Sequence, residues 1–279
     1  MPERLSAEQI DQFVELGFCT LRGVFTRQCA VAARDLLWTR MAQKAGIHRD
    51  DPRTWPALYT GEAQIDAPAV QACFTDALAE AIETLLGPGR WTGIRKWGFW
   101  PVNFSFGADA SDAFPDEGWH LDGTWFKWPP APGWHSLDAL QQGLFAIGLF
   151  TDLAAGGGGT ALALGSHKTT ARTLARYPHG HADCNLFDEV LREPIGNFHE
   201  ITGAVGDVVL AHPLLLHARG YKRSGPPRII SITDAMLRAP INLDRADGGY
   251  SILEESIRHA LRSAPDAPRQ AKLCRGPAE

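Results

Sequence analysis

Long apolar runs are missing from this sequence of 279 residues. No uninterrupted apolar stretch approaches the ~20 residues that a membrane-spanning helix requires. The opening residues 1–5 also lack the basic start and apolar centre of a secretory signal. We therefore expect a cytoplasmic protein with no membrane partner.

Basic residues are outnumbered by acidic ones. The chain has 27 Lys and Arg against 32 Asp and Glu, which gives a formal net charge of -5. An acidic protein has no general attraction for phosphate backbones or for polyanionic substrates such as acyl-CoA. The balance argues against nucleic acid as a partner and favours a small, free metabolite as the ligand.

Cysteine pairs that could bind zinc or form a redox centre are also absent. The cysteines are odd in number, widely separated and never spaced as Cys-x-x-Cys. We interpret them as reduced thiols, most of which fill packing positions. They are Cys19, Cys29, Cys73, Cys184 and Cys274.

What is present is the composition of one globular domain. Hydrophobic residues make up 44% and charged residues 21% of the chain, and its length suits a single β-barrel or sandwich with added helices. We expect one domain over residues 1–279, with a helical part at about 1–90, a β core at about 91–240 and a C-terminal helix at about 250–262. The sequence leaves the oligomeric state open.

The N-terminal part carries helix start and stop signals. The run Ser6-Ala7-Glu8-Gln9 is a capping box, in which serine and glutamine each accept a hydrogen bond from the other's backbone N–H. It predicts a helix from Ala7 to Gly17. The other elements predicted here are a strand at 18–22, a helix that Thr26 caps and Gly46 ends, and a helix at 69–86.

From Trp91 onward, short apolar or alternating runs separated by Gly and Pro replace the helical period. This pattern predicts the strands of a sandwich or barrel. The predicted strands are 94–99, 102–106, 118–122, 143–150, 160–164, 207–211 and 228–236. Loops are predicted at 107–117 and 128–142, and irregular or helical cover at 167–192.

The most informative motif is the triplet His120-Leu121-Asp122. Alternate residues of a strand point to the same face, so the histidine and the aspartate could bind one metal ion together. A distant histidine would complete a set of two histidines and one carboxylate, which is typical of non-haem Fe(II) oxygenases. The triplet by itself is a weak signal, because such triplets are common.

A downstream block supplies that histidine. It contains Gly206-Asp207 and then His212-Pro213-Leu214-Leu215-Leu216-His217, and Arg228 follows eleven residues after the second histidine. In this block the sequence resembles the phytanoyl-CoA dioxygenase family of Fe(II)- and 2-oxoglutarate-dependent oxygenases. The run Leu164-Gly165-Ser166-His167 is similar to the Pro-Gly-Ser-His element of that family, with leucine in place of proline.

The resemblance implies a mainly β fold with helices (α+β), in which helices pack on one side of a double-stranded β-helix, a jelly-roll or cupin-like core. It implies that His120, Asp122 and His217 bind the catalytic Fe(II). Arg228 would hold the far carboxylate of 2-oxoglutarate, for which a planar, bidentate guanidinium is suited. Asn103, on an earlier strand, is a second candidate contact of this co-substrate.

The reaction of the family consumes O2 and 2-oxoglutarate, releases succinate and CO2, and oxidises an unactivated C–H bond, most often by hydroxylation. Related halogenases carry a small residue where Asp122 stands, so the aspartate favours hydroxylation over halogenation. Desaturation, epoxidation or cyclisation in a specialised-metabolite pathway is the alternative. We expect a small, largely apolar substrate, because Trp125 and Trp128 follow the triplet and could line its pocket.

Three rival classes stay open. A zinc hydrolase could use two histidines and one carboxylate, but it would also need a general base, and the position of Arg228 would have no explanation. A non-catalytic β-sandwich binding module would not need the complete ligand set. An oxygen-using enzyme independent of 2-oxoglutarate would not need Arg228.

Other motifs have simpler interpretations. The run Gly156–Gly159 is predicted to be a turn and not a phosphate loop, because a strand and no Lys-Ser/Thr pair follows it. His212 and His167 are predicted to pack or hydrogen-bond beside the site without binding metal. Three histidines in loop-like segments are predicted to lie at the surface: His135, His181 and His199.

Overall fold

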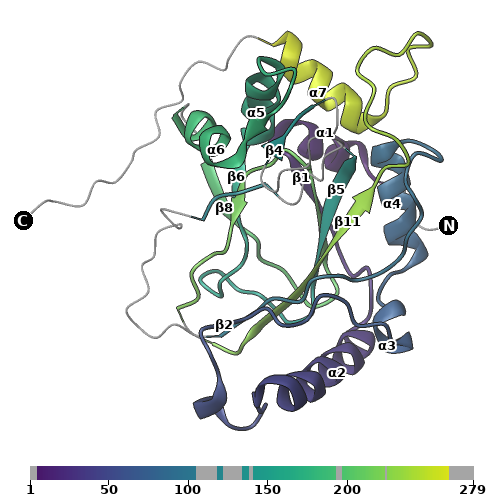
Figure 1. Ribbon diagram of the computed structural model, residues 1–279. Coiled ribbons are helices and arrows are strands. Elements are labelled where there is room, and N and C mark those ends of the chain that lie inside the picture. Colours follow the sequence, from purple (N-terminus) through teal and green to yellow (C-terminus); the bar gives the residue numbers. More distant parts are fainter. Residues whose placement is uncertain are drawn as a thin grey trace, which may run out of the picture.

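The computed structural model describes residues 5–104, 118–121, 134–137, 141–192, 197–223 and 225–263 (Figure 1). Three predicted site residues, Asp122, Trp125 and Trp128, lie outside the described residues, as does the predicted loop 107–117. Among the helices that are described, none is long and apolar enough to cross a membrane.

The strands form antiparallel sheets. In the six-stranded sheet the order is β1 (Phe18–Leu21), β9 (Val208–Ala211), β5 (Gln142–Leu149), β11 (Arg228–Met236), β3 (Val102–Asn103) and β2 (Leu58–Tyr59). The three-stranded sheet has the order β10 (His217–Ala218), β6 (Ala161–Leu164) and β8 (Asn197–Glu200), and β4 (Trp134–His135) pairs with β7 (His181–Ala182). Strand β1 agrees with the strand predicted at 18–22, whereas β2 lies in the part predicted to be helical.

Side chains of β5 alternate between two apolar clusters. Phe145 and Ile147 pack with Leu162 of β6, so they fill the space between the six-stranded and three-stranded sheets. Leu144 points to the opposite face and joins the larger cluster, which includes helix residues such as Leu37. Because both faces are covered, β5 is buried along its whole length, which accounts for its continuous apolar sequence.

The helices cover one side and one end of the sheets (Figure 1). The predicted capping box is present on α1 (Ala7–Leu16), which Gly17 ends with a φ of 89°. Thr26 and Gly46 cap α2 (Arg27–Ala45), also as predicted. The remaining cover is α5 (Ser166–Ala175), α6 (Asp183–Arg192) and α7 (Ile252–Arg262), and α7 packs on α1 and α5.

The helix predicted at 69–86 is instead two helices, α3 (Pro68–Gln71) and α4 (Asp76–Leu86). Thr75 causes the break, because its backbone is extended and its side chain accepts a hydrogen bond from the N–H of Leu78. A threonine in this role begins a new helix and cannot continue the previous one.

The strand predicted at 94–99 is also wrong in part. This segment joins β11 only through single bridges, one from Trp91 to Leu237 and one from Phe99 to Ile232. Eight residue steps of the segment (99 − 91) therefore lie against five of its partner (237 − 232). The three extra residues force the segment to bulge, which prevents a regular ladder.

The predicted strands at 143–150, 160–164, 207–211 and 228–236 correspond to β5, β6, β9 and β11. Strands β2, β4, β7 and β10, each of two residues, were not predicted, and neither was β8. Runs of two residues are too short to show an alternating pattern.

Three of the cysteines are described as free thiols. Cys19 and Cys73 are buried, and burial raises the pKa of each to about 12. At neutral pH both therefore remain protonated, in agreement with the predicted packing role. Cys29 is half-buried.

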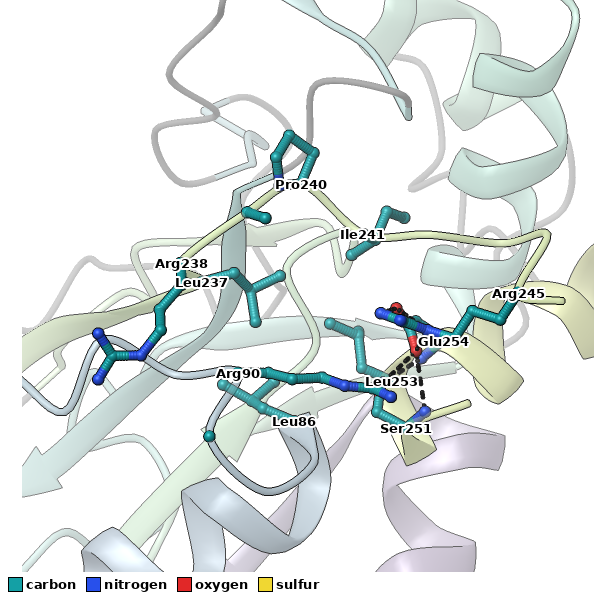
Figure 2. A pocket seen from close by; sticks show the side chains of 12 residues that line it. Leu86, Arg90, Leu237, Arg238, Pro240, Ile241, Arg245, Ser251, Leu253 and Glu254 are labelled. Atoms are coloured by element: carbon teal, nitrogen blue, oxygen red, sulfur yellow. Dashed lines mark hydrogen bonds and ion pairs between the residues drawn. The ribbon is translucent and has the colours of Figure 1, made fainter. Parts of the chain in front are cut away.

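A buried carboxylate joins α7 to two distant segments. Glu254, which is 2% exposed, accepts hydrogen bonds from Arg90 and Arg245 and from the backbone N–H groups of Ser251 and Asn242. Figure 2 shows both arginines reaching it beside a cavity of about 250 Å³. Burial alone would raise the pKa of Glu254, but these hydrogen bonds lower it from 4.5 to about 2.

We predict that Glu254→Gln lowers the free energy of unfolding at pH 7 by on the order of 3 kcal/mol, because the carboxylate is more acidic in the folded state. This contribution is complete above pH 4.5 and is lost as the pH falls through about 2. Urea denaturation at pH 7 and pH 3 measures it. The control is Glu80→Gln on the exposed side of α4. A difference that stays constant between the two pH values would contradict the role assigned to Glu254.

Candidate active site

The fold brings His120 and His217 together. Their backbones exchange two hydrogen bonds, of 2.9 Å from the N–H of His120 and 3.1 Å from that of His217. Their ring centroids are 4.4 Å apart, and the ring of Phe145 packs 4.6 Å from that of His217. Two predicted metal ligands that are far apart in sequence are therefore adjacent.

Backbone carbonyl groups orient both rings. Nδ1 of His120 lies 2.7 Å from the carbonyl oxygen of Gly118, and Nδ1 of His217 lies 3.1 Å from that of Leu215. A carbonyl can only accept, so each Nδ1 carries the proton and a neutral ring presents its lone pair at Nε2. Metal-binding histidines are commonly oriented by such a bond.

The third predicted ligand, Asp122, is not among the described residues. Within the part of the chain that is described, no group of three His, Cys, Asp or Glu side chains is placed to hold a metal ion. The two histidines alone thus provide the geometry of the candidate metal centre.

Arg228 begins β11 and is 3% exposed. Burial and, to a smaller extent, Arg219 lower its pKa to about 10, while Glu200 raises it, so the guanidinium stays charged at neutral pH. No carboxylate among the described residues forms an ion pair with it, and its Nε has no hydrogen-bond partner. A buried charge that forms no ion pair is costly, so this position suits an anionic ligand.

Asn103 lies beside Arg228, since the two residues are paired across β3 and β11. Its side chain is fully buried, and its Nδ2 donates a 3.3 Å hydrogen bond to the carbonyl oxygen of Gly220. Its Oδ1 is buried without a hydrogen-bond partner. The amide is therefore bound to the protein backbone, beside the predicted co-substrate position.

A cavity of about 720 Å³ connects the histidines to Arg228. Alternate residues of β11 face it, as the period of two in a strand requires, whereas Ile229 faces the helix-side core. These cavity residues are Arg228, Ile230, Ile232, Asp234 and Met236, and Thr233 also reaches the cavity from between them. The alternation is readable in the sequence once β11 is assigned.

The bulged segment before β3 forms another wall of the cavity. Its contributing residues include Thr92, Ile94, Lys96, Gly98 and Phe99. Ile94 is 54% exposed and Phe99 is 41% exposed, although both are large and apolar. Such side chains inside a cavity offer apolar surface to a ligand. Neither Ile94 nor Lys96 was predicted to belong to the site, although their alternate spacing is a usable signal.

Three other histidines are buried. His167 and His212 are buried, with ring centroids 4.7 Å apart, as expected for supporting residues. His135, predicted to lie at the surface, is 3% exposed and packs near Phe187, so that prediction is wrong. It lies in β4, a strand too short to be recognised in the sequence.

His181 and His199 are half-buried and lie in β7 and β8. His199 stacks on Phe18, with ring centroids 5.2 Å apart. Neither is as exposed as predicted, because both belong to strands and not to loops.

The known proteins that this chain resembles were found by structure and not by sequence. No protein-family model matches the chain, and no curated protein matches its sequence. Membership of the phytanoyl-CoA dioxygenase family therefore stays a prediction.

Several solved structures share the fold. SnoK, described as a non-haem α-ketoglutarate-dependent carbocyclase from nogalamycin biosynthesis, matches with a TM-score of 0.52 and 18% identity over 98% of this chain and 97% of its own. AviO1 from Streptomyces viridochromogenes Tue57 matches with a TM-score of 0.50 and 20% identity over 86% of this chain and 98% of its own. HygX from Streptomyces hygroscopicus, with nickel, 2-oxoglutarate and hygromycin B bound, matches with a TM-score of 0.51 and 17% identity over 82% of this chain and 86% of its own. These structural matches show a common fold of helices and antiparallel sheets.

We predict a pH-dependent loss of stability from the buried histidine pair. Burial lowers the pKa of His167 from 6.5 to about 4 and that of His212 well below 6.5. Below pH 6.5 the two imidazoles bind protons in the unfolded chain but stay neutral in the folded one. The free energy of unfolding is therefore at its full value above pH 6.5 and falls as the pH drops toward 4. His167→Gln should flatten this fall by up to about one proton.

Thermal or urea unfolding measured between pH 7 and pH 4 gives the slope for the wild type and for His167→Gln. His48→Gln, at an exposed position, is the matched control and should keep the slope of the wild type. An equal slope in His167→Gln would show that this ring is not held neutral by burial.

Proposed function

We propose that this protein is an Fe(II)- and 2-oxoglutarate-dependent oxygenase whose two larger sheets form a double-stranded β-helix. The observation that carries the proposal is the buried guanidinium of Arg228, which forms no ion pair with a described carboxylate and lies in the same cavity as the two adjacent histidines. A cationic anchor and a pair of oriented imidazoles are what a metal-bound, dianionic co-substrate needs. The common fold with structures such as SnoK and HygX supports the same class.

His120 and His217, with Asp122 as the third ligand, would hold the iron. The donor set fits, because both rings have Nδ1 bound to a carbonyl group and can present Nε2 to a metal. With 2-oxoglutarate and O2, such an iron supplies oxidative chemistry that converts an unactivated C–H bond and releases succinate and CO2. The two oriented imidazoles would fix the position of the metal in the cavity.

Arg228 would bind the distal carboxylate of 2-oxoglutarate. Its fork can donate two parallel hydrogen bonds, and the ligand would supply an ion-pair partner in a buried position. Asn103 would hold the adjacent wall through its bond to Gly220. A zinc hydrolase would have no comparable use for this guanidinium, so Arg228 favours the oxygenase.

The substrate proposed here is a small metabolite with a substantial apolar body. The cavity, at about 720 Å³, has room for more than the co-substrate, and Ile94, Phe99 and Ile232 provide apolar contacts. Trp125 and Trp128 are proposed as further contacts. Hydroxylation is the preferred outcome, and desaturation, epoxidation or cyclisation in specialised metabolism is the alternative.

Anaerobic addition of Fe(II) and 2-oxoglutarate to the wild type should produce a visible metal-to-ligand charge-transfer band. His217→Ala should lose this band because it removes one of the oriented imidazoles. His48→Ala, at an exposed position, should retain it. Absence of the band from folded wild-type protein would reject the proposed function.

Arg228→Ala should raise the dissociation constant of 2-oxoglutarate at least about 30-fold, since bonds to a buried charge contribute on the order of 2 kcal/mol. The charge-transfer band, titrated with 2-oxoglutarate, measures this constant. Arg27→Ala is the control, because Arg27 lies on α2 and forms an exposed ion pair with Asp152. An unchanged constant in Arg228→Ala would remove the arginine from the co-substrate site.

A further inference from the structure

The glycine turn between β5 and β6 encloses a carboxylate. The backbone N–H groups of Gly156, Gly158 and Gly159 donate hydrogen bonds of 2.8, 3.1 and 3.0 Å to the side chain of Glu200. Successive N–H groups that converge in this way form a concave anion site. Here a residue of β8 fills it, which explains why the turn is not free to bind phosphate.

Glycine is required in this turn for conformation and for space. Gly156 and Gly158 have φ values of 75° and 81°, which residues with a side chain rarely adopt. A Cβ atom on Gly159 would lie 2.0 Å from the carbonyl oxygen of Ile201. The turn is therefore pressed closely against β8, the strand that carries Glu200.

The other side of the turn contacts the segment that follows His217. A Cβ atom on Gly220 would lie 1.9 Å from the carbonyl oxygen of Gly159, so the two backbones touch. Gly157 also forms a β-bridge with Lys222. The turn thus sets the position of the chain that leads from β10 to β11.

The turn also reaches the co-substrate end of the cavity directly. A Cβ atom on Gly158 would lie 2.8 Å from Nδ2 of Asn103, which donates to the carbonyl oxygen of Gly220. Asn103 is paired with Arg228 across the sheet. A short series of contacts therefore runs from Glu200 through the glycine turn to Asn103 and Arg228.

We infer that Glu200 is a positioning residue for the co-substrate end of the site, acting through the glycine turn on Asn103 and Arg228. The inference rests on the proposed function, because Arg228 must bind a carboxylate for the position to matter. Glu200 does not bind the co-substrate itself, since a carboxylate repels an anion and its oxygens already accept three backbone bonds.

The test compares Glu200→Gln and Glu200→Ala by titrating the anaerobic Fe(II) complex with 2-oxoglutarate. Glutamine keeps one acceptor oxygen for the N–H groups of Gly158 and Gly159 but has no acceptor for that of Gly156. We expect its dissociation constant to rise about tenfold. Alanine keeps neither acceptor, so its constant should rise further, while glutamine partly rescues binding.

Asp207→Asn is the matched control. Asp207 is also buried and accepts backbone hydrogen bonds, from Gly23 and Ala204, but it holds a different loop. Its amide variant should lose stability and keep the wild-type constant for 2-oxoglutarate. An equal rise of this constant in Asp207→Asn would mean that the Glu200 variants act by general destabilisation, and it would overturn the inference.

Hydrogen exchange of the glycine amides gives a readout that does not depend on the co-substrate. In both Glu200 variants the amides of Gly156, Gly158 and Gly159 should exchange at least about tenfold faster than in the wild type. Unchanged protection, or lost protection with an unchanged dissociation constant, would overturn the inference while Arg228→Ala still tests the proposed function. A wild type that binds no 2-oxoglutarate would overturn both.

Discussion

Strand β11 lies between the helix-side core and the cavity, and the site depends on which of its side chains face the cavity. It pairs with β5 on one edge and β3 on the other, so its backbone is held at the centre of the sheet. Because its side chains alternate, Ile229 packs into the helix-side core while Arg228 and Ile230 face the cavity. A shift of one residue would exchange these faces and bury the guanidinium among helices. The register of β11 therefore fixes the chemistry of the cavity.

Backbone carbonyl groups hold several polar side chains of the site. Carbonyl groups of Gly118 and Leu215 orient the two histidines, and that of Gly220 accepts from Asn103. Arg228 is the exception, since its charge is left for a ligand to satisfy.

The cavity owes its open wall to a mismatch between two paired segments. Eight residue steps of chain between Trp91 and Phe99 lie against the five steps from Ile232 of β11 to Leu237 just after it, so the segment bulges instead of forming a ladder. The bulge leaves Ile94 and Phe99 exposed within the cavity. The same irregularity that ends regular pairing thus produces the surface on which an apolar ligand can pack.

Local signals were readable in the sequence because they depend on neighbouring residues. The capping box at Ser6, the caps of α2 and the alternation of β11 are all properties of short runs. The histidine pair and Arg228 were also proposed from spacing and resemblance, and the fold places them in one cavity.

Features that depend on distant contacts could be seen only in the tertiary structure. The burial of His135 against Phe187 follows from packing that no short run encodes. The same is true of the contacts that join Glu200, through the glycine turn, to Asn103. The sequence by itself determined which residues could carry out the chemistry. The tertiary structure decided which of them meet and which buried charge forms no ion pair with a described residue, because burial and long-range pairing depend on the whole chain.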